Sequence, residues 1–429
     1  MPIDRRTFLK RTSAATIGFA GGPYFHFPKK SYRLALIGCG WWGNNILREA
    51  IMEGSSQVVG LCDVDEEALK STSKMIDGMA TDKPVYFKDF RECIEKSQPE
   101  IVIVATPDHW HALPAIDAIK NGAHVYLEKP IGHTINEGKA ILRAARSEER
   151  IVQVGTHRRV SPHNISGMEF LRSGKVGEIV SVKAFVNYNS PPGKASSPGQ
   201  PPEHLDWDYW VGPAPDQPFL PQIHPRGFRQ FLDFANGTVG DWGIHWFDQI
   251  LWWTEERYPK TVYSTGGRFV KEDSSDAPDT QYATFEFETF TLYWEHKLCN
   301  PNSNESHNVG CYFYGTEGTF HMGWLDGWTF YPAKKGEEVI HVEPTLHDPD
   351  KQNIRELWAD FLKSVQNKQY PVSDVLHGHL ATNMSLLAMI SYKLGRSVRW
   401  DGQTESFRND NEANKLLSRP YRPPWIYPV

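Results

Sequence analysis

The segment that most constrains the fold of this chain is Arg33–Gly43, RLALIGCGWWG. Its apolar run LALI is typical of a buried parallel strand, and Gly38, Gly40 and Gly43 follow in G-x-G-x-x-G spacing. In such a turn the first glycine permits a tight bend, the second lets the backbone approach a pyrophosphate, and the third lets helix and strand pack closely. The helix expected over 44–53 directs free N–H groups at the phosphates. The segment therefore predicts a dinucleotide-binding unit.

A second predicted strand, Val58–Cys62, ends at Asp63, about 20 residues after the last glycine of the turn. A carboxylate at this distance binds a ribose 2′-hydroxyl and disfavours the 2′-phosphate of NADP. The alternative is that Asp63 caps the helix that follows in the run DVDEE. We favour ribose binding because strand, turn, helix and acid occur in the required order. The sequence therefore predicts NAD rather than NADP.

The composition fits two folded domains. The chain has 429 residues, 40% hydrophobic and 23% charged, with a net charge of −6. The net charge gives no reason to expect a nucleic-acid partner, and no apolar run approaches the ~20 residues of a membrane span. There are five cysteines. Cys299 and Cys311 flank a polar loop and could pair in an oxidising compartment, but free thiols are the favoured interpretation because no disulfide framework is evident.

Residues 1–28 have the character of a targeting segment. Arg5 and Arg6 open the run RRTFLK, and a mildly apolar stretch follows, which resembles a twin-arginine export signal. This predicts a periplasmic protein exported in the folded state. The alternative is a cytoplasmic protein with a basic amino-terminal tail.

Strands and helices alternate over residues 32–154, which predicts a doubly wound, Rossmann-type parallel sheet forming a dinucleotide-binding domain. Ligands of such sheets bind at the carboxyl ends of the strands. Two loops at predicted strand ends carry chemistry, 106–111 (TPDHWH) and 128–130 (EKP). After the second strand, the expected strands are 85–87, 101–105, 124–127 and 151–154, and the expected helices are 66–76, 90–96, 113–121 and 135–147.

Residues 155–415 have a different pattern and predict a second, α+β domain with a mostly antiparallel sheet. Residues 190–202 are rich in Pro, Gly and Ser and predict a long loop, and the Pro- and aromatic-rich tail, 416–429, is interpreted as a strap over a neighbour. The expected strands are 179–188, 261–269, 281–288, 291–297, 310–314 and 318–322, and the expected helices are 353–367 and 375–394.

Lys129 is the first candidate catalytic residue, because a lysine beside a nicotinamide can polarise a substrate oxygen or share its proton. The alternative is an exposed loop lysine. The second candidate group is Asp241, His245 and Asp248, which share one face with Trp252 if their segment is helical. A carboxylate one turn from an imidazole orients it as a general base. The alternative is helix-surface hydrogen bonding. No H-E-x-x-H spacing occurs, so no metal is predicted.

These motifs resemble the Gfo/Idh/MocA oxidoreductase family over nearly the whole chain. The resemblance rests on the glycine turn, the ATPxxxH segment at 105–111, the EKP segment at 128–130 and the DxxxH segment at 241–245. It implies that Lys129, Asp241 and His245 are the catalytic groups and that the peptide before Pro130 is cis. It also implies that residues 155–415 form a domain for substrate binding and oligomerisation with a large open sheet. Homo-oligomers, dimers or tetramers, are expected to be built through sheet faces.

The same resemblance implies further contact residues. Arg158, Trp242 and Asp248 are expected at the substrate. The cofactor residues are expected to be Gly38, Gly40, Trp41, Trp42, Gly43, Asp63, Thr106, Pro107, His111, Glu128, Lys129 and His157.

The expected reaction is oxidation of a secondary alcohol of a sugar, polyol or glycoside, with His245 oriented by Asp241 as base and Lys129 stabilising the alkoxide. Export to a compartment without free NAD predicts a retained cofactor. One alternative is glycoside cleavage by oxidation at C3, elimination and re-reduction. Another is a catalytically silent NAD-binding sensor or scaffold. The motifs do not identify the carbohydrate.

Overall fold

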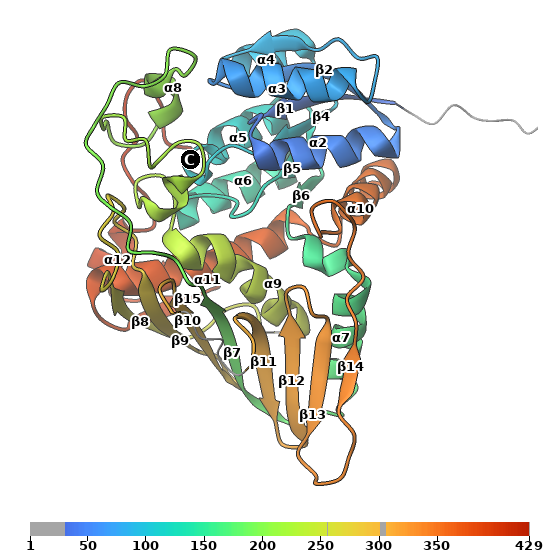
Figure 1. Cartoon of the computed structure of the whole chain (residues 1–429), viewed down its shortest axis with the longest axis vertical. Helices are drawn as coiled ribbons and strands as arrows, with labels where there is room; N and C mark the ends of the chain where they lie inside the picture. Colours follow the sequence, from blue (N-terminus) through green and yellow to red (C-terminus); the bar gives the residue numbers. More distant parts are fainter. Residues whose placement is uncertain (1–30, 255, 301–305, 429) are drawn as a thin grey trace, which may run out of the picture. The chain divides into compact units, whose positions relative to one another are not determined.

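The computed structural model describes residues 31–254, 256–300 and 306–428, so the predicted export signal at 1–28 lies outside the described residues. The amino-terminal part forms a six-stranded sheet with strand order β3-β2-β1-β4-β5-β6, in which every neighbouring pair is parallel (Figure 1). This confirms the doubly wound sheet. Its strands are β1 (Tyr32–Ile37), β2 (Ser56–Cys62), β3 (Val85–Phe87), β4 (Ile101–Val104), β5 (His124–Leu127) and β6 (Val152–Val154).

Helices pack on both faces of this sheet, as crossover connections between parallel strands require. One of them, α10 (Ile354–Asn367), comes from far along the chain: its Leu357, Trp358 and Phe361 share a buried cluster with β1. A segment predicted as part of the second domain therefore covers the first sheet. The other helices of this layer are α2 (Trp41–Glu53), α3 (Glu66–Asp77), α4 (Phe90–Ser97), α5 (Ala112–Lys120) and α6 (Ile135–Ser147).

The second sheet has ten strands in the order β14-β13-β12-β11-β7-β10-β9-β8-β15-β16. All neighbouring pairs are antiparallel except β7–β10, which is parallel, so the prediction of a mostly antiparallel sheet is confirmed. The strands are β7 (Ile179–Asn187), β8 (Thr261–Gly267), β9 (Thr280–Glu286), β10 (Thr291–Lys297), β11 (Val309–Gly315), β12 (Gly318–Gly323), β13 (Trp328–Pro332), β14 (Ile340–Val342), β15 (Val398–Asp401) and β16 (Ser406–Phe407).

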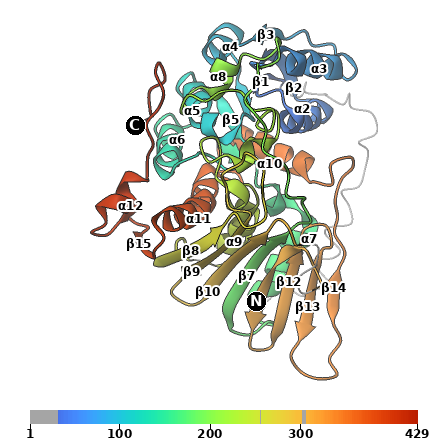
Figure 2. The same cartoon turned by 60° about the vertical axis from the view of Figure 1, so that its left-hand side comes forward.

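One face of the ten-stranded sheet is covered by α7 (Pro162–Arg172), α9 (Ile244–Trp253) and α11 (Val375–Leu394), as Figure 2 shows. Trp246 and Phe247 of α9 are fully buried there. The alternation of buried and exposed residues along β8, β9 and β10 is typical of a sheet with one packed and one open face. The short helices α8 (Trp207–Val211) and α12 (Asn411–Lys415) complete the second part.

The tail packs on its own chain. Trp425 stacks on Phe90 and meets Trp110 edge to face, and Arg419 pairs with the buried Glu137 at 3.3 Å. The neighbour that this segment straps is therefore the nucleotide-binding part of the same molecule.

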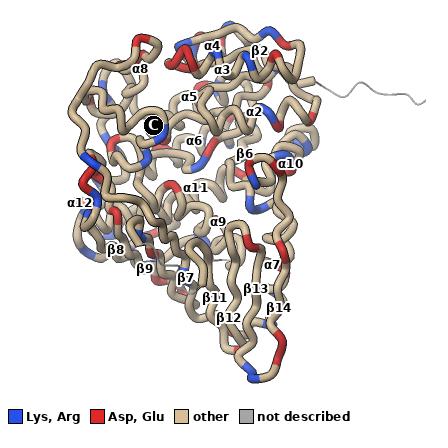
Figure 3. Tube along the Cα trace, in the orientation of Figure 1, with Lys and Arg blue, Asp and Glu red and all other residues tan. Residues whose placement is uncertain are grey.

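All five cysteines are free thiols, so Cys299 and Cys311 do not pair. Within the described part of the chain, no helix has the length and apolar character needed to cross a membrane. Basic and acidic residues are interspersed along the trace (Figure 3).

Candidate active site

A cavity of about 530 Å³ lies at the carboxyl ends of β1, β2, β4 and β5. Residues of the second part, from Tyr209 to Trp324, close its other side. Ligand binding at this edge is what the doubly wound topology favours. The predicted site residues that line the cavity are Gly38, Gly40, Trp41, Trp42, Asp63, Thr106, Pro107, His111, Glu128, Lys129, His157, Asp241, Trp242 and His245.

The glycine turn has the geometry that its spacing predicts. Gly38 has φ +96°, and a Cβ on it would lie 2.6 Å from the Ala105 carbonyl carbon. A Cβ on Gly43 would lie 2.1 Å from the Gly38 carbonyl oxygen, so Gly43 serves close packing of α2 on β1 and does not line the cavity. Gly40, in contrast, has open space where its Cβ would be. The backbone at Gly40 is therefore free to approach a ligand.

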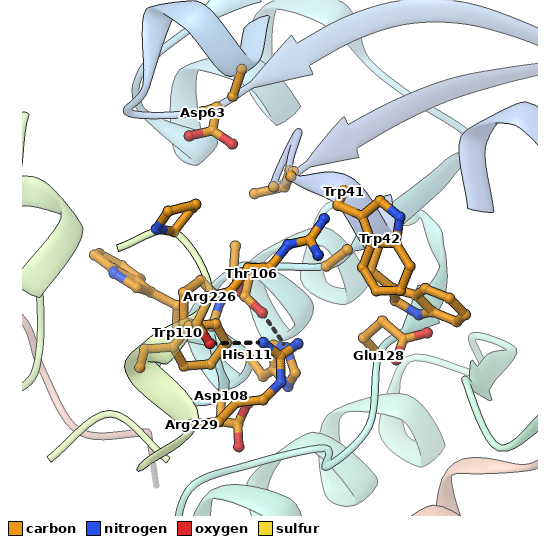
Figure 4. Close-up of a pocket in the computed structure, with 18 of the residues that line it drawn as sticks. Trp41, Trp42, Asp63, Thr106, Asp108, Trp110, His111, Glu128, Arg226 and Arg229 are labelled. Atoms are coloured by element: carbon orange, nitrogen blue, oxygen red, sulfur yellow. Dashed lines mark hydrogen bonds between the residues drawn. The ribbon is translucent and has the colours of Figure 1, made fainter. Parts of the chain in front are cut away.

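Asp63 lies at one end of the cavity, well separated from Asp108 in Figure 4. Its carboxylate accepts hydrogen bonds from the N–H groups of Cys39, at 2.7 Å, and Asp65, at 2.9 Å. Burial raises the pKa of Asp63 to about 6 although these bonds lower it. Asp65, not Asp63, caps α3, because it accepts from the N–H groups of Glu67 and Ala68. Asp63 is therefore available for a ribose, and the turn, helix terminus and carboxylate together fit a dinucleotide.

Lys129 also lines the cavity, where Asp241 holds its ammonium group. The ammonium Nζ donates to Asp241 Oδ1 at 2.7 Å and to the Asp241 carbonyl oxygen at 2.8 Å. Arg229 Nε lies 3.3 Å from the same carboxylate oxygen. Burial alone would raise the pKa of Asp241, but the Lys129 and Arg229 charges outweigh it and hold the pKa at about 2. Asp241 is therefore ionised at neutral pH. The peptide bond between Lys129 and Pro130 is cis, as expected.

His245 lines the same cavity, but Asp241 does not orient it as expected. Asp241 lies in the π-helical turn Val239–Gly243 that precedes α9, and its carboxylate is engaged by Lys129 and Arg229. Among the described residues, His245 Nδ1 has no hydrogen-bond partner. The imidazole is placed by ring packing instead, 4.9 Å from Trp324 and 5.5 Å from His157. Burial, with the Lys129 and Arg158 charges, lowers the pKa of His245, so the ring is neutral.

Two of the three expected substrate residues lie outside the cavity lining. Asp248, three residues after His245 in α9, is buried and pairs with Arg159 at 2.9 Å. Arg158 is buried with its guanidinium 3.8 Å from the Trp324 ring centroid. Trp242 alone of the three lines the cavity.

The sequence did not single out two buried carboxyls as titrating groups. Asp108 is 6% exposed and Glu128 is 5% exposed, and both line the cavity. Burial raises the pKa of Asp108 to about 7 and that of Glu128 to about 7, although nearby Arg229 and Lys129 lower both. His111 between them is fixed by the carbonyl oxygens of Pro130, at 2.6 Å, and Thr106, at 2.8 Å.

Residues from the long connection between β7 and α9 were also missed. Arg229 and Arg226 line the cavity, and the Arg226 guanidinium lies 4.7 Å from the Trp41 ring centroid (Figure 4). The same connection contacts the β2–α3 loop, where His204 Nδ1 lies 2.9 Å from Asp65. Trp324, in the loop after β12, is a further lining residue. These segments carry no motif, so only their long-range contacts reveal them.

The fold and the cavity define a two-part oxidoreductase with a Rossmann domain that binds NAD(P). Three models of one family match in succession. The NAD-binding Rossmann-fold model of the Gfo/Idh/MocA oxidoreductase family matches residues 32–156, and two of its carboxy-terminal domain models match 215–321 and 336–427. The chain belongs to the Gfo/Idh/MocA family.

Two solved structures show how widely this fold is shared. The WlbA dehydrogenase from Bordetella pertussis, in complex with NADH and UDP-GlcNAcA, is 18% identical with a TM-score of 0.65, covering 87% of this chain and 99% of that one. Levoglucosan dehydrogenase, in complex with NADH and levoglucosan, is 17% identical with a TM-score of 0.67, covering 86% and 99%. At these identities the likeness shows the fold alone.

Curated relatives match over shorter stretches. A glycosyl hydrolase family 109 protein 2 from Shewanella sp. (strain ANA-3) is 26% identical over 156 residues, 35% of this chain and 34% of its own. An alpha-N-acetylgalactosaminidase from Shewanella oneidensis is 23% identical over 208 residues, 42% of this chain and 45% of its own. The chain thus spans less than half the length of either relative.

Proposed function

We propose that this protein is an NAD-dependent oxidoreductase acting on a secondary alcohol of a sugar, polyol or glycoside. The observation that carries the proposal is the meeting of Lys129, from the nucleotide-binding part, with Asp241 and His245, from the second part, in one cavity. A catalytically silent sensor would need neither an ammonium fixed by two oxygens nor a neutral imidazole at the nicotinamide end of the groove.

The roles follow from the contacts. The neutral imidazole of His245 accepts the hydroxyl proton. Lys129 has three N–H donors; two are used by Asp241, and the third stabilises the developing alkoxide. Asp241 therefore acts on Lys129, holding its ammonium in place. NAD, when bound, supplies the acceptor for the hydride that leaves the same carbon.

The preference for NAD over NADP rests on Asp63. Its carboxylate faces the cavity at the end where the adenosine ribose is expected, and a 2′-phosphate there would meet a negative charge.

We also propose that the cofactor is retained through turnover. This is supported by two contacts of the connection between β7 and α9 with the nucleotide-binding part, Arg226 on Trp41 and His204 with Asp65. Purified protein is denatured and its supernatant assayed for dinucleotide. Bound NAD supports retention, and empty protein contradicts it.

A redox-neutral cleavage of glycosides is the second candidate. Names of the curated relatives favour it, and so does Asp108, because a carboxyl with a pKa of about 7 keeps a proton that it can donate to a leaving oxygen. Sugars and glycosides are screened with protein of known cofactor content. Net dehydrogenation changes nicotinamide absorbance and product oxidation state; cleavage releases free sugar with no net change in absorbance. If no carbohydrate in the screen gives either outcome, both candidate reactions are contradicted.

For localisation we propose the periplasm, supported by Arg5 and Arg6 in the RRTFLK run. Fractionation of cells producing the full chain tests this. Export that is lost when both arginines are replaced by lysine supports a twin-arginine signal. Cytoplasmic protein in both cases supports the alternative.

A further inference from the structure

A group of metal-ligating side chains lies at the second sheet, apart from the residues that line the cavity. His321 is on β12, His307 precedes β11, and Asp326 is in the loop between β12 and β13. One ligand atom from each lies within 4.8 Å of the others. His307 Nδ1 is 2.7 Å from an Asp326 carboxylate oxygen. No sequence motif predicts this set, because the three residues come from separate segments.

The buried member of the group has no other polar partner. His321 is 0% exposed, and neither of its ring nitrogens has a hydrogen-bond partner in the part of the chain that is described. Its ring stacks on that of His307, with centroids 3.8 Å apart. Buried polar groups are rarely left unsatisfied, so such an imidazole needs an explanation.

The neighbouring backbone leaves room for the ligand atoms. Gly310 of β11 and Gly323 of β12 are direct partners in the ladder. A Cβ on Gly310 would lie 2.5 Å from His321 Nε2, and a Cβ on Gly323 would lie 1.7 Å from Asp326 Oδ1. The imidazole of His321 and the carboxylate of Asp326 therefore occupy the space that side chains at these two paired positions would fill.

We propose that His307, His321 and Asp326 bind a divalent transition metal of the zinc class. Two imidazoles and one carboxylate are a donor set that zinc accepts, with water as the fourth ligand. Donor atoms around tetrahedral zinc lie about 3.3 Å apart, so the His307–Asp326 pair, now at 2.7 Å, would separate, and the three ligand atoms, now within 4.8 Å of one another, would adjust to that spacing. His307 and Asp326 make the necessary rotations, since their side chains are 22% and 43% exposed.

The metal would hold the loop that forms one wall of the active-site cavity. Asp326 and Trp324 belong to the same short connection between β12 and β13. Trp324 packs on His245, at 4.9 Å, and on Trp242, at 5.0 Å, and lies under the Arg158 guanidinium. Coordination of Asp326 would therefore fix the place of the aromatic wall. The role is structural, so it does not depend on which reaction the cavity performs.

The test measures zinc on the full chain, without a histidine tag. Protein is stripped with a chelator, given Zn²⁺, dialysed and analysed for metal. The parent is expected to retain one Zn²⁺ per chain. The Asp326→Asn and His307→Gln variants are expected to have a lower affinity for Zn²⁺. The loss should exceed the ~10–100-fold seen when a residue that only hydrogen-bonds to a metal ligand is replaced. His347→Gln is the matched control, because His347 pairs with Glu356 at 3.1 Å but has no third ligand among the described residues.

A second measurement guards against misfolded variants. The chelator is expected to lower the Tm of the parent and of His347→Gln, and Zn²⁺ to restore it, while the Tm of Asp326→Asn stays unchanged by either. Co²⁺ in place of Zn²⁺ is expected to give tetrahedral d–d absorption in the parent only. A parent chain that retains no zinc, or variants that retain it as the parent does, would overturn the site and leave a stacked histidine pair beside an aspartate.

Discussion

Lys129 is the residue on which the proposed chemistry depends most. Its Nζ is fixed by two oxygens of Asp241, and Arg229 shares the carboxylate. The distance between Lys129 and Asp241 in the sequence is 112 residues, so no local pattern predicts that they touch. The EKP and DxxxH segments supplied the candidate residues; the tertiary structure supplied the contact between them.

Replacing Lys129 by alanine is expected to lower kcat by roughly 10²–10⁴, because the donor to the developing alkoxide is lost. NAD affinity is expected to stay near that of the parent, since Lys129 lies at the far end of the groove from Asp63. Steady-state rates and NAD titration measure the two quantities. Lys70→Ala, an exposed lysine paired with Glu66 at 3.6 Å, is the control and keeps full activity. Equal rates for both variants would remove Lys129 from the mechanism.

Glu128 makes the stability of the fold depend on pH. Its pKa of about 7 in the folded protein is above the ~4.3 of an unfolded glutamate, so the folded state keeps a proton that the unfolded chain loses. The contribution of this group to the free energy of unfolding therefore falls as pH rises from about 4 to about 7, by on the order of 3 kcal/mol. Glu128→Gln is expected to flatten that decline.

Denaturant unfolding at several pH values measures this effect. Asp108 shifts in the same direction, so part of the decline remains in Glu128→Gln. The exposed Glu92, paired with Lys96 at 2.7 Å, gives the control variant Glu92→Gln, which follows the parent curve. Buried neutral histidines such as His245 change the stability of the parent in the opposite direction over this pH range, so the test is the difference between the two curves. A Glu128→Gln variant with the same pH slope as the parent would contradict the assignment.

At the scale of elements, two glycines of the same turn have different roles: Gly43 serves the packing of α2 on β1, and Gly40 is expected to serve NAD binding. Gly43→Ala is expected to destabilise the fold by roughly 1–3 kcal/mol or more, because its Cβ would meet the Gly38 carbonyl oxygen. Gly40→Ala is expected to leave the Tm without cofactor unchanged, since its Cβ meets nothing, but to weaken NAD binding by about tenfold or more. Thermal unfolding and NAD titration test the pair. Parent-like NAD affinity in Gly40→Ala would place the pyrophosphate elsewhere.

Element types were predictable where the hydrophobic period is strong. The expected bounds of 85–87, 124–127, 135–147, 291–297 and 375–394 agree with the structure. Helix α7 was missed because it begins at a proline and contains Gly167, and its polar first turn, PHN, resembles a loop. The strands β13 to β16 are short and follow turn-rich sequence, so their pairing with β12 and β8 is decided by the sheet rather than by local preference.

At the scale of the whole molecule, the second sheet has an open face rich in tyrosine. Tyr263, Tyr282, Tyr293 and Tyr331, on four of its strands, are each 39–47% exposed. Exposed aromatic groups on a flat sheet are typical of protein–protein contact. We therefore propose a homo-oligomer, a dimer or tetramer, assembled through this face.

A glutamate at Tyr293 is expected to convert the oligomer to monomer, because burying an unpaired carboxylate opposes assembly. Light scattering after size-exclusion chromatography measures the mass. Val85→Glu, at an exposed residue of β3 in the other sheet, is the control and keeps the parent mass. A parent chain that is monomeric at micromolar concentration, or a Tyr293→Glu variant of unchanged mass, would contradict assembly through this face.

The sequence by itself determined the two-part architecture and the ends of the cavity, because glycine spacing, strand period and a terminal carboxylate act over short stretches. The tertiary structure decided which groups meet. It assigned Asp241 to Lys129 rather than to His245, paired Asp248 with Arg159, and brought His307, His321 and Asp326 together. These contacts join segments distant in the chain, and a π-helical turn of five residues was enough to change the side-chain spacing that a regular helix predicts.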